Sequence, residues 1–124
     1  MTDAGEVLRQ ARGVLDGTHA VPAAQVSRVA AILARQALEE LIVDRLAQLG
    51  AQVPGATMRS KLVCLRGLDD RVVAESATIA WDGLSRACHL HAYELPPMPE
   101  EVGYLIDMVE ALLEPSRAAV PAAR

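Results

Sequence analysis

The stretch PAAQVSRVAAILARQALEELIVDRLAQL, residues 22–49, is the longest run of helix-forming sequence in the chain. Pro22 suits the first turn of a helix, and Gly50 suits its stop. At about 100° per residue, the two halves of this helix present two apolar faces, rotated by roughly a third of a turn. Such a helix is either deeply buried in its own domain or shared with a partner chain. The first face comprises Val26, Ala30, Leu33 and Ala37, and the second comprises Leu38, Ile42, Leu46 and Leu49.

Four shorter stretches also favour helices, and strand patterns are missing from the sequence. Because the connections between them are short, we expect an all-α fold, a compact antiparallel bundle of four to five helices. The domain is expected to span residues 1–114, with a disordered Ala/Pro-rich tail at 115–124. The first of these helices is predicted to begin at an Asp3–Glu6 capping box and to end at Gly13 or Gly17. The next runs from Met58 to about Gly67, and the following one begins at a cap at Asp69 or Asp70 and reaches about Ala92. The last runs from Pro99 to Pro115.

Composition narrows the class of protein. Phe is absent and aromatic residues make up 2% of the 124 residues, so the core must be aliphatic. The formal net charge of -4 argues against a dedicated nucleic-acid binder but leaves room for a local arginine site.

No apolar run reaches the roughly 18 residues of a membrane span and no targeting pattern opens the chain, so we expect a soluble cytoplasmic protein with no membrane contact. Cys64 and Cys88 are expected to be small buried residues rather than a disulfide.

The sequence RACHLH, residues 86–91, gathers an arginine and two of the three histidines near the end of the fourth predicted helix. Helical spacing places Asp82, Arg86, His89 and Tyr93 on one side of that helix. Arg86 and Asp82, four residues apart, are expected to pair on the surface. The opposite, apolar side collects Val73, Ala77, Ala80, Trp81, Leu84 and Cys88, together with His91.

Two interpretations of this cluster stay open. In the first, His91 is a partly buried histidine bonded to a backbone carbonyl, while Arg86 is a solvated arginine held by Asp82. In the second, Arg86 binds an RNA phosphate and a histidine moves a proton. Arg86 and His91 point about 140° apart in an ideal helix, so this second arrangement needs a bend or a second chain across a two-fold cleft.

The spacing Arg86-x4-His91, late in a helix of a small all-α domain, resembles the Arg-x4-6-His motif of HEPN domains (higher eukaryotes and prokaryotes nucleotide-binding domains). The segment WDGLSRACHLHAYELPP, residues 81–97, is also similar to that of small actinobacterial HEPN-like proteins. The resemblance spans residues 6–113 in helix order. It implies a homodimer with facing motifs, and in many members a metal-independent endoribonuclease of toxin or defence type that leaves a cyclic phosphate.

By this resemblance, Arg86 would stabilise the phosphorane and His91 would move the proton, with His89 as a further catalytic candidate. Asp82 and Tyr93 are the predicted substrate contacts. No cofactor is expected. Possible partners are RNA, an antitoxin and a nucleotidyltransferase. Active members usually carry a polar residue after the arginine, where this chain has Ala87.

The alternative function is a non-catalytic helical dimerisation or interaction module that binds a partner protein. Ala87, the acidic charge balance and the predicted core side of His91 favour it. A metal site is not expected, because His89 and His91 do not face one ligand on a helix. The densest basic stretch, Arg59, Lys61, Arg66 and Arg71, is predicted to be a solvated face that flanks the motif only if the third and fourth helices form a hairpin.

Overall fold

All regular structure in the described part of the protein is helical. A computed structural model describes residues 3–89, 95 and 97–119 of the chain. The predicted all-α class is confirmed, with five α-helices and one 3-10 turn in these ranges. The elements are α1 (Ala4–Leu15), η1 (Ala23–Gln25), α2 (Val26–Gln48), α3 (Met58–Leu68), α4 (Arg71–Cys88) and α5 (Pro99–Ala119).

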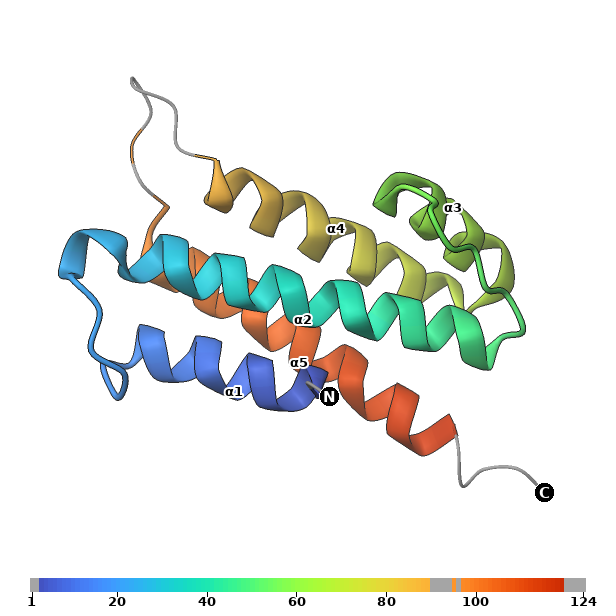
Figure 1. Ribbon diagram of the computed structural model, residues 1–124, viewed down its shortest axis with the longest axis horizontal. Helices are drawn as coiled ribbons and strands as arrows, with labels where there is room; N and C mark the ends of the chain where they lie inside the picture. Colours follow the sequence, from blue (N-terminus) through green and yellow to red (C-terminus); the bar gives the residue numbers. More distant parts are fainter. Residues whose placement is uncertain (1–2, 90–94, 96, 120–124) are drawn as a thin grey trace.

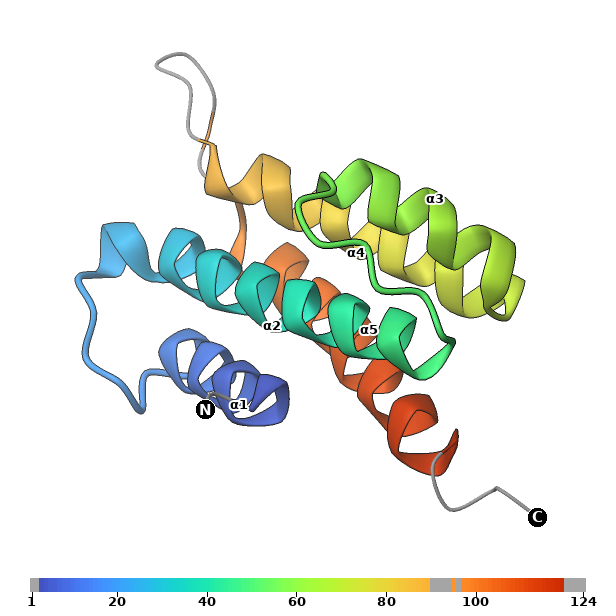
Figure 2. The ribbon, with the colours of Figure 1, turned by 45° about the vertical axis from the view of Figure 1, so that its right-hand side comes forward.

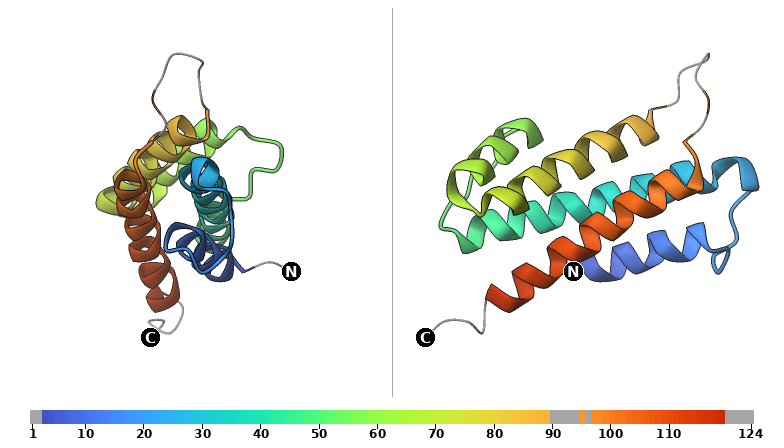
Figure 3. Two further views of the ribbon diagram at one scale, coloured as in Figure 1. Left: turned by 90° about the vertical axis from the view of Figure 1, so that its left-hand side faces the viewer. Right: turned by 180° about the vertical axis from the view of Figure 1, so that it is seen from behind.

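Four helices, α1, α2, α4 and α5, pack around a shared core, and each runs opposite to the preceding one (Figure 1). The shorter α3 lies outside this group against α2 and α4, as Figure 2 shows from a second side. The view from behind in Figure 3 shows α5 crossing in front of α2 and lying beside α1, both of which it contacts. The order of helices therefore brings the end of α4 beside the beginning of α5.

The double apolar character of α2 is explained within the chain itself. Helix α2 contacts all four other α-helices, so both of its apolar faces find partners. Ala30, Ala37 and Ile42 have no exposed surface, whereas Leu49, predicted to be apolar and inward, is partly exposed beyond the helix end. The core is aliphatic, as predicted. Its largest fully buried side chains are Leu8, Leu38, Ile42, Leu46, Leu65, Leu84, Val102, Ile106 and Val109.

Turns and caps follow the sequence signals at most helix ends. Gly17 and Gly50 adopt φ of +87° and +85° just after α1 and α2, a conformation in which a side chain is unfavourable. At α4, the Asp70 side chain accepts a hydrogen bond from the Val72 amide at 2.8 Å. Thr57 caps α3 in the same way through the Ser60 amide. These contacts satisfy backbone donors that the first helical turn leaves without partners.

Two predicted helix ends and one predicted capping bond are wrong. Asp3 occupies the N-cap of α1, as predicted, but makes no side-chain capping bond, because it is exposed and water can satisfy the first amides. Helix α5 runs past Pro115 to Ala119, since proline removes one amide and bends a helix without always ending it. The predicted tail is therefore helical up to residue 119, and residues 120–124 lie outside the described part. Helix α4 ends at Cys88, not near Ala92.

A buried ion pair fixes the corner between α2 and the α3–α4 connection. Arg45 donates from Nε to Asp69 Oδ2 at 2.5 Å and from Nη2 to Asp69 Oδ1 at 3.0 Å. The two side chains are only 11% and 5% exposed. Such two-bond geometry is specific to arginine and carboxylate. None of the helices in the described ranges has both the length and the apolar character required for a membrane span.

Candidate functional site

Helix α4 places Arg86 in its last turn, next to the end of the buried face. Ala80, Leu84 and Cys88 are buried as predicted, and the chain leaves the helix at His89, whose backbone is extended. Helical stability in a protein comes largely from burying an apolar face. Cys88 is the last residue of α4 and, among the described residues, the last buried one before Val102.

This early end of α4 removes the basis for one prediction. The 140° separation of Arg86 and His91 assumed a helix that continues through both residues, and α4 does not. His91 and Tyr93 lie outside the described residues. Their predicted roles in proton transfer and substrate contact remain predictions.

Arg86 and His89 line the same groove, which lies between the end of α4 and the start of α5. The groove encloses about 570 Å³, within the range of small-molecule and cofactor sites. Its opposite wall carries Glu100, Glu101 and Tyr104 from the first turns of α5. Cationic and anionic groups therefore share one groove.

A glycine sets how closely the two walls approach. A Cβ added at Gly83 of α4 would lie 2.9 Å from both terminal methyl carbons of Leu105 on α5. Atoms at that distance overlap, so Leu105 can pack as it does only because residue 83 is a glycine, which has no side chain. Both residues line the groove, and their contact defines its inner end.

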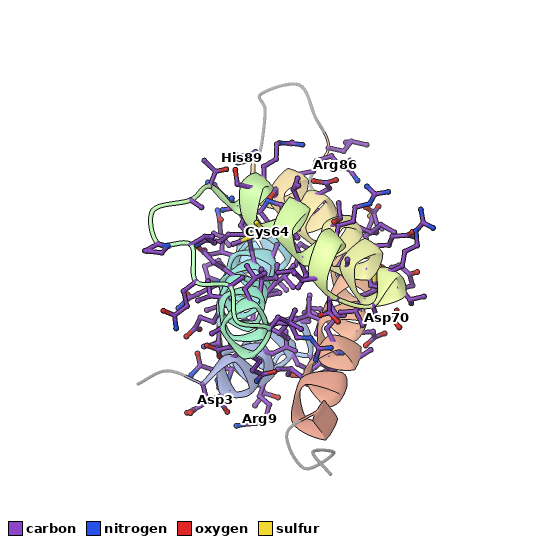
Figure 4. The ribbon with its side chains drawn as sticks, turned by 90° about the vertical axis from the view of Figure 1, so that its right-hand side faces the viewer. Asp3, Arg9, Cys64, Asp70, Arg86 and His89 are labelled. Carbon is purple, nitrogen blue, oxygen red and sulfur yellow. The ribbon has the colours of Figure 1, made fainter. Side chains whose placement is uncertain are left out.

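The Arg86 guanidinium is exposed and, within the described residues, makes no hydrogen bond or ion pair. The predicted Asp82–Arg86 pair is therefore wrong, because two exposed side chains four residues apart gain little from pairing in water. Asp82 is exposed on α4 but does not line the groove. Figure 4 shows Arg86 and His89 at the same end of the molecule, far from Asp3 and Arg9.

The sequence interpretation missed a second set of contacts beside the groove, between α2 and α4. The Arg35 guanidinium lies 4.3 Å from the centre of the Trp81 ring, a cation–π arrangement. Arg35 Nε also donates to the Ser85 hydroxyl at 3.0 Å. The sequence pattern around either residue does not predict this contact, because Arg35 and Ser85 are 50 positions apart and meet only when α2 packs against α4.

Cys88 is a buried free thiol, as predicted, while Cys64 is half-buried. Burial raises the pKa of the Cys88 thiol, and the nearby charges of Arg35 and Arg28 oppose that rise. The raised pKa keeps Cys88 in the thiol form, which is a poor nucleophile. The described residues contain no group of three or more His, Cys, Asp or Glu side chains able to hold a metal ion.

Helices α3 and α4 pack side by side, as the predicted hairpin requires. Arg66 of α3 lines a hollow with Glu75 and Ile79 of α4. Ile79 also lines the groove of Arg86, seven positions or about 10 Å further along the helix axis. Comparison with models of protein families, with curated proteins and with solved structures gave no match for this chain.

Proposed function

We propose that this protein acts on RNA at the α4–α5 groove, as a HEPN-like, metal-independent endoribonuclease of the toxin or defence type. The observation that carries the proposal is the placement of Arg86 and His89 in one groove, both exposed and with Arg86 unpaired within the described residues. A planar guanidinium suits a phosphate, and an imidazole exchanges a proton near neutral pH. The resemblance of the Arg86–His91 spacing to the HEPN motif suggests the type of reaction, which is metal-independent cleavage of RNA.

The proposed reaction cleaves the RNA backbone with its own 2′-hydroxyl. The 2′-oxygen bonds to phosphorus as the bond to the 5′-oxygen breaks, leaving a 2′,3′-cyclic phosphate and a 5′-hydroxyl. A histidine accepts the 2′-hydroxyl proton, and the departing 5′-oxygen receives a proton. Arg86 stabilises the charge that develops on the phosphorane oxygens. His91 takes the proton-transfer role by resemblance, and His89 is the polar group already in the groove.

The HEPN resemblance also supports a homodimer in the cytoplasm, with the two Arg86 sites facing each other. An antitoxin or a nucleotidyltransferase would be the partner protein. A two-fold arrangement lets one chain supply the arginine and the other a histidine to the same phosphate.

Cleavage of single-stranded RNA by purified protein in EDTA tests the proposal. We expect cyclic-phosphate products, with Arg86→Ala lowering the rate by about 10²–10³ and His91→Ala by about 10²–10⁴. Arg9→Ala, an exposed arginine of α1, is the matched control and should cleave as the wild type does. Equal cleavage by wild type and Arg86→Ala, prepared in parallel, would assign the activity to a contaminant and refute the proposal.

A second candidate, a non-catalytic module that binds a partner protein, is favoured by the apolar lining of the same groove. Tyr104 is 64% exposed and Ile79 is 56% exposed, and both border it. Glu100 and Glu101 also oppose a purely anionic ligand there. This candidate predicts a stable complex with a co-expressed partner, no RNA cleavage, and loss of the complex in Tyr104→Asp.

A further inference from the structure

The first half of α2 carries an uncompensated positive charge. Between Ala23 and Gln36 the chain has two arginines, Arg28 and Arg35, and no acidic residue, whereas Glu39, Glu40 and Asp44 follow. Seven residues are almost two helical turns, so Arg28 and Arg35 project in similar directions about 10 Å apart along the axis. An otherwise acidic protein therefore concentrates two cations on one short length of helix.

These arginines lie next to the end of α4. Arg35 contacts Ser85 and Trp81, the residues one and five positions before Arg86. Arg35 uses Nε for its bond to Ser85, and its terminal nitrogens make no hydrogen bond within the described residues. Arg28 is exposed and has no hydrogen-bond or ion-pair partner in the same ranges. Both arginines are close enough to Cys88 for their charges to act on its thiol.

A narrow segment separates the α4–α5 groove from the surface of α2. Leu95 and Pro97 line that groove and also line a second hollow of about 360 Å³, which contains Arg28. Glu100 and Glu101 line the α4–α5 groove, which also contains Arg86. In contrast, no acidic residue of the described ranges lines the hollow of Arg28. A polyanion that leaves Arg86 and passes Leu95 and Pro97 therefore reaches a hollow whose described lining holds one charged residue, Arg28.

We infer that single-stranded RNA held at Arg86 continues past Leu95 and Pro97 onto α2, where Arg28 and Arg35 bind further phosphates. This inference rests on the proposed function and extends it from one phosphate to a path along the strand. Arginine suits such a path because its planar fork binds phosphate oxygens, while its face can stack on a base. Arg35 is already held flat over Trp81, so less side-chain freedom is lost when a phosphate binds.

The salt dependence of RNA binding tests the inference. We would measure the Kd of wild type, Arg28→Gln, Arg28→Lys, Arg86→Gln and Arg9→Gln for a 12-nucleotide single-stranded RNA between 0.05 and 0.3 M salt, by fluorescence anisotropy. The RNA carries 2′-O-methyl groups, so that it keeps its phosphates but cannot be cleaved by 2′-hydroxyl attack. Loss of one phosphate contact lowers the slope of log K against log salt by about 0.7, which weakens Kd about fivefold at 0.1 M salt. We expect that change for Arg28→Gln, the wild-type slope for Arg28→Lys and no change for Arg9→Gln.

Trp81, the single tryptophan of the chain, gives a second readout at Arg35. Because the Arg35 guanidinium covers its ring, RNA bound there should change the tryptophan emission of wild type during the titration. Arg35→Gln should abolish that change and lower the slope by about 0.7, while its circular dichroism and Tm report whether it remains folded.

The outcomes separate this inference from the proposed function. No RNA binding by wild type, or no effect of Arg86→Gln, overturns the proposed function. RNA binding that depends on Arg86, with Arg28→Gln and Arg35→Gln behaving as Arg9→Gln does, overturns the α2 path alone. Equal affinity for RNA and for polyglutamate of the same charge would assign the α2 arginines to an acidic protein segment and also overturn the path.

Discussion

Replacing Asp69 with asparagine should destabilise the fold, because it removes the negative partner of a largely buried ion pair. The side chain of Asp69 is 5% exposed, accepts two bonds from Arg45 and accepts the Asp70 amide at 2.7 Å. Removing one partner of a buried ion pair costs about 3–5 kcal/mol. Asparagine keeps one acceptor oxygen for Arg45, and a hydrogen bond to a charged group is worth about 1.5–3 kcal/mol, so we expect a loss of about 2 kcal/mol for Asp69→Asn.

The pH dependence identifies the cause of that loss. Hydrogen bonds from Arg45, with a smaller contribution from the Asp70 amide, lower the pKa of Asp69 below its ordinary value of 3.8. A lowered folded-state pKa stabilises the protein above the unfolded-state pKa, and the gain disappears as the pH falls through the folded-state pKa. The difference in unfolding free energy between wild type and Asp69→Asn should therefore be constant from pH 7 to about 5 and shrink below about pH 4.

Urea unfolding followed by circular dichroism and Trp81 fluorescence measures this difference at each pH. Asp44→Asn, which changes an exposed carboxylate on the same helix as Arg45, is the control and should stay within about 0.5 kcal/mol of wild type. The reasoning fails if Asp69→Asn matches that control at pH 7. It also fails if the loss at pH 2.5 equals the loss at pH 7, since the stabilisation from a lowered pKa declines once the pH falls below the unfolded-state pKa.

Three further perturbations test the packing. Gly83→Val should cost about 1–3 kcal/mol in urea unfolding because its side chain meets Leu105, and the cost should fall in a Leu105→Ala background. Arg12→Gln breaks the α1–α5 ion pairs with Asp107 and Glu110, but these carboxylates are largely exposed, so its loss of stability should be about 1 kcal/mol or less and vanish in 1 M salt. Ile42→Asp places a charge at a position with no exposed surface, and circular dichroism should show an unfolded chain at 25 °C.

The fold was largely predictable because its determinants are local. Helix-forming residues, the Gly17 and Gly50 stops and the Asp70 cap each act within a few positions, and the structure confirms them. The end of α4 was not predictable from the prolines that follow it. That end depends on how far α2 and α5 cover the helix, which sequence periodicity does not report.

The candidate site was predictable only in part. The sequence assigned Arg86 and His89 to the polar side of one helix, and both are exposed, although only Arg86 lies on α4 and His89 follows its last residue. The contacts of Arg35 with Trp81 and Ser85 join segments some 50 residues apart, and no local pattern indicates which α2 residue faces which α4 residue. Glu100 and Glu101 follow Pro99, the predicted start of the last helix, and the α4–α5 packing makes them the far wall of the groove.

The packing of α4 also accounts for the apolar residue after Arg86. Ala87 is 7% exposed, because it lies at the inner edge of the groove, against the core. A polar side chain there would need a buried hydrogen-bond partner, and leaving it without one costs about 1–3 kcal/mol. His89 does not need a buried hydrogen-bond partner, since it follows the last helical residue and is exposed in the groove. If the groove cleaves RNA, the polar group that assists Arg86 must therefore come from beyond the end of α4 or from the α5 wall, and His89→Ala becomes as informative a variant as His91→Ala.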